Sequence, residues 1–141
     1  MANTSYGEIA HELSTDYVRY KLGLDTNTNP SFYAETLRRV GDQVEERYDL
    51  ALQGLVCQFN YDPILDGERS VGVIFDAIFE NEECSWGRIV MVYVFAARLA
   101  KYCQKQGYEK DTIEQLSRFA GSYVEDHLKH WIKEQGGWVS T

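Results

Sequence analysis

Apolar side chains recur at steps of three and four residues along most of this chain, and that spacing places them on one face of an α-helix. The first such segment ends at Gly23 and the polar run 25–30, and it carries Tyr6, Ile9, Leu13, Tyr17, Tyr20 and Leu24. Ser31 has the residue type and the position of an N-cap for a second helix. That helix carries Tyr33, Leu37, Val40, Val44 and Tyr48 on one face. Residues 50–59 either continue it or form a short helix of their own.

The second half of the chain follows the same pattern. Turn-forming residues between 60 and 69 predict a loop, and the short amphipathic helix after it carries Val71, Ile74, Phe75, Ile78 and Phe79. Ser85 is placed to cap a helix over residues 86–104, which begins apolar nearly all round, as a helix buried on every side does. Asp111 is placed to cap a further helix whose inner face carries Ile113, Leu116, Ala120, Tyr123, Val124 and His127. With one or two terminal turns over 131–141, the pattern predicts an all-α chain of about seven to eight helices.

Composition narrows the classes of protein. A length of 141 residues with 44% hydrophobic residues suits one packed domain over residues 1–141. The formal charge of −8 argues against a nucleic-acid or anionic-membrane surface. Three cysteines without a C-x-x-C pair fit a reducing compartment better than a disulfide scaffold. The longest apolar run, residues 89–97, is half of what a membrane span needs, which favours a buried central helix.

Candidates for catalysis or metal binding are few. His127 and His130 stand three residues apart beside Glu125 and Asp126, a spacing that can supply metal ligands from one helical face. No further cysteine or histidine in the sequence completes such a set, and packing near a helix end explains both histidines more simply. The chain also lacks a Gly-x-Ser-x-Gly elbow and a glycine-rich phosphate loop. We therefore expect no enzymatic activity, no cofactor and no metal, with a helical enzyme or metal protein as the alternative that metal analysis would test.

The pair Gly41-Asp42 stands out inside the second predicted helix. Glycine in a helix interior costs about 1 kcal/mol relative to alanine, so a specific reason for it is expected. One interpretation is a close helix crossing at Gly41 with Asp42 merely solvated. The other is a recognition element, because Leu37 and Gly41-Asp42 form a Leu-x-x-x-Gly-Asp signature.

Four segments, taken in order, resemble the motifs of the Bcl-2 family of apoptosis regulators. Leu37-Arg38-Arg39-Val40-Gly41-Asp42 resembles the BH3 motif, and Ser85-Trp86-Gly87-Arg88-Ile89-Val90 resembles the BH1 motif, usually Asn-Trp-Gly-Arg. The segment from Trp131-Ile132 to Gly136-Gly137-Trp138 resembles the BH2 motif, and the helix 9–22 resembles the less specific BH4 motif. One such match would be weak, whereas the ordered set covers nearly the whole chain.

The resemblance implies a Bcl-2-like helical bundle around a hydrophobic central helix, with a surface groove that accepts a partner's amphipathic BH3 helix. By motif position the groove would be lined by Val44, Tyr48, Leu52, Leu55, Phe75, Phe79 and Phe95, with Arg47, Glu82, Ser85, Gly87 and Arg88 at its polar points. Arg88 would pair with the aspartate of the ligand, and Gly87 would leave room for the ligand's backbone. The chain's own BH3-like motif comprises Leu37, Val40, Gly41 and Asp42, and of these Leu37 and Val40 would face the core.

Some positions depart from the family pattern. Ser85 replaces the usual asparagine, and Ala96-Ala97 replaces a small Gly-Gly pair in the central helix. The chain stops at Thr141, shortly after the BH2-like motif, whereas family members usually continue into a last helix and an apolar tail. The resemblance therefore implies that a membrane tail is missing from this chain.

Within the family, the resemblance implies a prosurvival protein that sequesters BH3-only and Bak/Bax-type partners, because all four motifs are present. The alternative is a Bak-like effector that releases its own BH3 segment, oligomerises and permeabilises the outer mitochondrial membrane; the close likeness of residues 37–44 to a ligand BH3 supports it. The expected location is the cytoplasmic face of the outer mitochondrial membrane or endoplasmic reticulum, or the cytosol. The expected state is a monomer when unbound.

Overall fold

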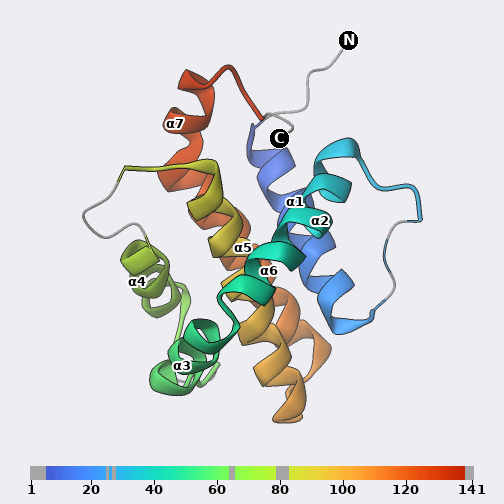
Figure 1. The fold of residues 1–141 in the computed structure, drawn as a ribbon. Helices are drawn as coiled ribbons and strands as arrows, with labels where there is room; N and C mark the ends of the chain where they lie inside the picture. The colour runs from blue at the N-terminus through green and yellow to red at the C-terminus, as the bar shows by residue number, and fades with distance from the viewer. Residues whose placement is uncertain (1–5, 25, 27, 64–65, 79–82, 139–141) are drawn as a thin grey trace.

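The computed structural model describes residues 6–24, 26, 28–63, 66–78 and 83–138. Within these ranges the chain forms seven α-helices and one π-helical turn, so the prediction of an all-α fold is confirmed (Figure 1). The elements are α1 (Tyr6–Leu22), α2 (Phe32–Arg47), α3 (Asp49–Phe59), α4 (Glu68–Ile78), α5 (Trp86–Lys105), α6 (Lys110–Tyr123), the π-turn η1 (Val124–Leu128) and α7 (Lys129–Glu134). Residues 50–59, left open by the sequence, belong to a separate helix after a break at Tyr48.

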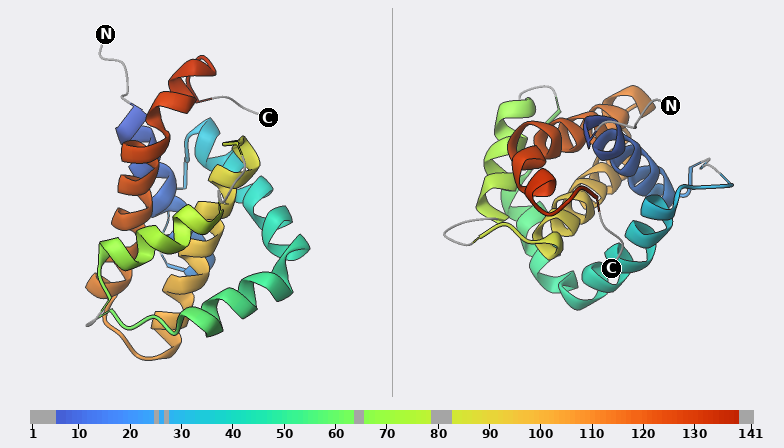
Figure 2. Two further views of the ribbon diagram at one scale, coloured as in Figure 1. Left: turned by 90° about the vertical axis from the view of Figure 1, so that its left-hand side faces the viewer. Right: turned by 90° about the horizontal axis from the view of Figure 1, so that it is seen from above.

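Helix α5 is the centre of the bundle, as its nearly continuous apolar sequence predicts. It runs through the middle of both views in Figure 2, and α1, α2 and α6 pack against it. Its buried residues are Ile89, Val92, Tyr93, Val94, Phe95, Ala96, Ala97, Leu99, Ala100 and Cys103. In the part of the chain that the structure describes, neither α5 nor any other helix combines the length and apolar content needed to cross a membrane.

Two of the three predicted helix caps are present. The Ser31 hydroxyl accepts a hydrogen bond from the Ala34 amide at 3.1 Å, and the Ser85 hydroxyl accepts one from the Arg88 amide at 3.2 Å. Both bonds satisfy an amide that the first turn of a helix leaves without an internal partner. The prediction for Asp111 is wrong, because α6 begins at Lys110 and places Asp111 inside the first turn.

The end of α6 also differs from the predicted pattern. A π-turn over Val124–Leu128 separates α6 from α7, and it adds a residue to one turn of the helix. The inner face therefore does not continue in register: Val124 is fully buried as expected, but His127 is exposed. Apolar periodicity does not reveal such an insertion, because it changes the phase of the helix without changing the residue types.

The pair Gly41 and Tyr17 explains the glycine inside α2. A Cβ atom built on Gly41 would lie 2.7 Å from three atoms of the Tyr17 phenol, which is closer than side-chain carbons approach one another. Tyr17 is itself fully buried in α1. Gly41 is therefore required for the close approach of α2 to α1, and that approach places α2 beside the surface described next.

Candidate binding groove

A groove of about 670 Å³ opens between the C-terminal half of α2, α3, the last residue of α4 and the first two turns of α5. Its lining consists of Gln43, Val44, Arg47, Tyr48, Ala51, Leu52, Leu55, Ile78, Ser85, Gly87, Arg88 and Met91. These segments are far apart in the sequence, and the two views of Figure 2 show how α2, α3 and α4 come together around α5. The groove is thus formed by the packing of four helices.

The floor of the groove is apolar and partly open to solvent. Leu52 is 1% exposed and anchors α3 to the core, whereas Leu55 is 37% and Tyr48 is 43% exposed. Val44, Ile78 and Met91 lie between these extremes as half-buried side chains. Contiguous exposed apolar side chains inside a concave surface are typical of a protein-binding site, because a partner's apolar residues can cover them.

The groove lining also includes polar side chains, contributed by α2 and by the start of α5. The Arg47 guanidinium lies 5.6 Å from the centre of the Tyr48 ring, a cation–π distance. Within α5, a Cβ atom built on Gly87 would meet only the Ser85 hydroxyl, at 3.8 Å. Packing inside the chain therefore does not demand glycine at position 87, and the open space there is available to the backbone of a ligand.

Arg88 links the groove to α4. Its guanidinium donates a hydrogen bond to the carbonyl of Ile78, at the C-terminal end of α4. Arg47 and Arg88 are the charged residues of the groove lining among the described residues, and both are cationic although the chain carries a formal charge of −8. This local charge favours a ligand that presents a carboxylate.

The structure brings eight of the twelve residues expected from motif position into this groove. They are Val44, Arg47, Tyr48, Leu52, Leu55, Ser85, Gly87 and Arg88. Phe75 and Phe95 lie in the core instead, 1% and 0% exposed, with ring centres 6.3 Å apart and planes at 87°. The other two, Phe79 and Glu82, lie outside the described residues.

Four lining residues were not anticipated, namely Gln43, Ala51, Ile78 and Met91. A signal for Met91 exists in the sequence, since it stands three residues after Arg88 on the same face of a helix. Ile78 also lies on the apolar face of its predicted helix. Gln43 and Ala51 carry no comparable signal, because their place depends on how α2 and α3 meet.

The chain's own Leu-x-x-x-Gly-Asp segment is folded into the domain. Leu37 is 6% exposed, and Val40 lines a small apolar cavity beneath Trp86 and Trp138. Asp42 is not merely solvated. Its carboxylate accepts hydrogen bonds from the Tyr17 hydroxyl at 3.3 Å, the Tyr20 hydroxyl at 2.5 Å and the Lys21 ammonium at 3.0 Å.

Further ion pairs extend this contact from α1 to α5. Lys21 reaches Glu45 at 2.8 Å, and Arg98 pairs with the same Glu45 at 2.6 Å and with Asp49. Burial alone would lower the pKa of Lys21, but its hydrogen bonds to Glu45 and Asp42 outweigh that effect and raise it. Asp42 and Glu45 of α2 therefore connect this helix to α1 and to α5.

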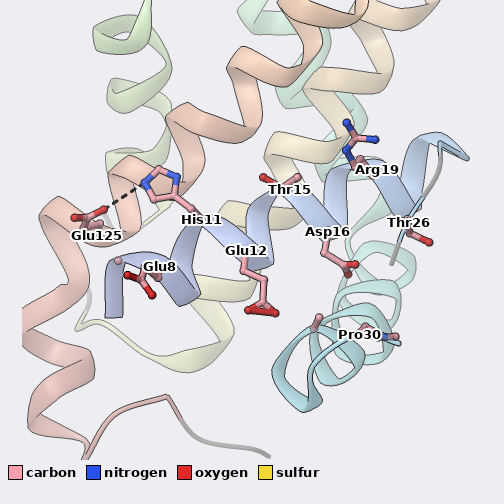
Figure 3. A pocket seen from close by; sticks show the side chains of 11 residues that line it. Glu8, His11, Glu12, Thr15, Asp16, Arg19, Thr26, Pro30 and Glu125 are labelled. Carbon is pink, nitrogen blue, oxygen red and sulfur yellow. Dashed lines mark ion pairs between the residues drawn. The ribbon is translucent and has the colours of Figure 1, made fainter. Parts of the chain in front are cut away.

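A second hollow, of about 800 Å³, lies along the outer face of α1, and Figure 3 shows its side chains. His11 faces Glu125 there at 3.3 Å, and Asp16 is paired with Arg38 on α2 at 2.6 Å. Most of the residues that line it are polar or charged, and several of these side chains form ion pairs. No group of three or more metal-binding side chains comes together within the described ranges, at His127 and His130 or elsewhere.

Comparisons with known proteins identify a matching family and several related proteins. Residues 37–138 match the family described as apoptosis regulator proteins, Bcl-2 family. The chain is 25% identical to Bcl-2-related protein A1 of Bos taurus, over 98% of this chain and 80% of that protein. It is 32% identical to human Bcl-2-like protein 1, over 74% of this chain and 43% of that protein, and so spans less than half of that relative's length.

The fold resembles that of the zebrafish pro-survival protein NRZ. The complex of NRZ with the Bad BH3 segment matches 94% of this chain and 88% of that chain, with a TM-score of 0.81 and 22% identity. The apo form of NRZ matches with a TM-score of 0.83 and 23% identity, over the same shares. At this identity the likeness establishes a common fold.

Proposed function

Because this chain belongs to the Bcl-2 family of apoptosis regulators, we propose that its groove binds the amphipathic BH3 helix of pro-apoptotic proteins and thereby restrains them. The observation that carries the proposal is an open apolar groove with Arg88 at its edge. NRZ, which has the same fold, has been solved with the Bad BH3 segment. Helix-in-groove recognition is an established binding mode of this family, and the proposal applies that mode to this chain.

The energetics of the groove suit such a ligand. A helix with apolar residues at i, i+3 or i+4, and i+7 would cover Val44, Leu55 and Met91 with one stripe. Each anchor contributes roughly 1.5–3 kcal/mol on burial, from which the costs of ordering and association are subtracted. Arg88 would add a charge-assisted contact to the ligand's aspartate and set the register of the helix.

The test is calorimetric titration of the folded Arg88→Ala variant with a BH3 peptide. Truncating a partly buried partner of a charge pair typically costs about 2–5 kcal/mol, so we expect binding weaker by a factor of about 30 or more. Arg118→Ala is the matched control, because Arg118 is exposed on α6 away from the groove. Circular dichroism establishes that each variant is folded. An unchanged affinity of the folded Arg88→Ala variant for the peptide would contradict the proposal.

The contacts that hold α2 against α1 favour a prosurvival role over an effector role. An effector has to expose its own BH3 segment, and here Gly41 packs on Tyr17 while Asp42 is bonded from three side chains of α1. Breaking these contacts together would expose buried apolar surface as well as the paired charges. In a liposome-release assay with an added effector, we expect this chain to reduce release; release caused by this chain alone would establish the effector role.

We also propose that the chain acts as a monomer at the cytoplasmic face of the outer mitochondrial membrane or endoplasmic reticulum, or in the cytosol. Its partners would be BH3-only and Bak/Bax-type proteins. Co-precipitation of Bak or Bax from mitochondrial fractions, lost in Arg88→Ala, would support this placement. Recovery of the chain only from other compartments would contradict it.

A further inference from the structure

Helix α4 is one of the four helices that form the groove. It packs on α5 and α6, and it meets the groove only through its last residue, Ile78. On the side of α4 away from the groove, a hollow of about 380 Å³ is lined by residues of α4, the end of α6 and the π-turn. The position of α4, and with it the shape of the groove, therefore depends on a small number of contacts.

One of these contacts is a polar tie across the rim of the rear hollow. The Tyr123 hydroxyl donates a hydrogen bond to the Asp76 carboxylate at 2.6 Å, which joins the end of α6 to α4. Tyr123 is only 7% exposed, and burial, followed by the bond to Asp76, raises the pKa of its phenol. The phenol is therefore a proton donor throughout the physiological range.

The ring of Tyr123 is in contact with two other rings. Phe75 of α4 meets it edge-on, with centres 5.1 Å apart and planes at 62°. His127, which lies in the π-turn, stacks on it with centres 4.5 Å apart and planes at 20°. A ring fixed in this way directs its hydroxyl at Asp76 with little loss of entropy on bonding.

The second polar tie on α4 is at the groove side, where Arg88 donates to the carbonyl of Ile78. Under the proposed function, the same guanidinium turns to the carboxylate of the ligand. A ligand carboxylate that accepts from Arg88 would thus compete with the Ile78 carbonyl, and the bond that holds the end of α4 would be lost. The rear tie, between Tyr123 and Asp76, involves neither Arg88 nor any residue of the groove lining.

We infer that Tyr123 and Asp76 are positioning residues for ligand binding: they hold α4 in place from behind while Arg88 exchanges Ile78 for the ligand's carboxylate. This inference rests on the proposed function for its binding part. Loss of the rear tie should weaken binding without removing any atom from the groove. The loss should be larger for a ligand that carries the aspartate than for one that lacks it.

The experiment compares two BH3 peptides, one with the motif aspartate and one with alanine in its place, on wild type and Tyr123→Phe. We expect Tyr123→Phe to weaken the aspartate peptide by about 3- to 10-fold, and the alanine peptide by less than about 2-fold. A purely structural role would lower both affinities alike. Equal losses, or none, for the two peptides would overturn the inference.

Matched variants separate the tie from general damage. Tyr102→Phe removes a phenol hydroxyl that donates to Asn60 at 3.4 Å; Tyr102 lines neither the groove nor the rear hollow, so this variant should leave both affinities unchanged. Asp76→Asn keeps an acceptor oxygen and should bind nearly as wild type, whereas Asp76→Ala should reproduce Tyr123→Phe. Failure of Asp76→Ala to do so would contradict a role for the pair.

Hydrogen exchange of the free protein tests the positioning part without any peptide. We expect the amides of α4 to exchange faster in Tyr123→Phe and unchanged in Tyr102→Phe. If wild type binds neither peptide, the proposed function fails, and exchange alone then decides whether the pair positions α4. Unchanged exchange in α4 would overturn the inference, whatever the peptides do.

Discussion

Replacing Gly41 by alanine tests the packing that places α2 beside the groove. Alanine is the better helix former, and in an open helix the exchange would gain about 1 kcal/mol. At this position, however, the new Cβ would lie 2.7 Å from three atoms of Tyr17, against an ordinary contact of 3.4–4 Å. The ring cannot easily withdraw, because Tyr17 is fully buried and its hydroxyl is bonded to Asp42.

The crossing of α1 and α2 therefore has to open. Overpacking of this kind typically costs about 1–3 kcal/mol, so after the gain in helix propensity we expect a net destabilisation of roughly 1–2 kcal/mol. Displacement of α2 also moves Val44 and Tyr48, which line the groove, and should weaken BH3 peptide binding.

Urea unfolding followed by circular dichroism measures the change, with Gly54→Ala as the matched control. Gly54 is also inside a helix, α3, but a Cβ built there has nothing within 4 Å, so alanine should stabilise the protein by up to about 1 kcal/mol. The two glycine-to-alanine exchanges should have opposite signs. A Gly41→Ala variant as stable as wild type would refute the steric account of this crossing.

Three further outcomes are expected. Asp42→Ala removes the common acceptor of Tyr17, Tyr20 and Lys21, and should cost about 1–3 kcal/mol in urea unfolding; a change below about 0.5 kcal/mol would mean that the contacts contribute little. Burial, followed by the charge of Asp62, raises the pKa of the Cys103 thiol from 9.0 to about 11, so the stability this thiol contributes is present below pH 9 and lost as the pH rises through 11. The free energy of unfolding should fall by on the order of 2 kcal/mol over that window, and less steeply in Cys103→Ala. Ser85→Ala should cost about 1 kcal/mol through loss of the α5 N-cap, while Ser85→Asn should retain it, as thermal unfolding of both variants would show.

The helices and two of their caps could be predicted from the sequence because each depends on local order. The three- and four-residue spacing of apolar side chains is a property of neighbouring positions, and so is the hydroxyl of Ser31 or Ser85 ahead of its helix. Motif order added the positions of Gly87 and Arg88, which the structure places in the groove lining. Periodicity also identified α5 as buried, since few of its positions are polar.

Other features depend on contacts between segments far apart in the chain. Apolar character marked Phe75 and Phe95 equally well as groove or core residues, and only the packing of α4 on α5 and α6 decided that both are buried. The partners of Asp42 lie more than 20 residues away in α1, so its sequence neighbours carry no sign of them.

The sequence by itself determined which segments are helical and which helix is central. Tertiary structure alone decided which apolar side chains remain exposed in the groove and that Tyr123 reaches Asp76 behind it. The physical reason is range. Helix propensity and capping act over three or four residues, whereas burial and hydrogen-bond partners across helices are set by the packing of the whole bundle.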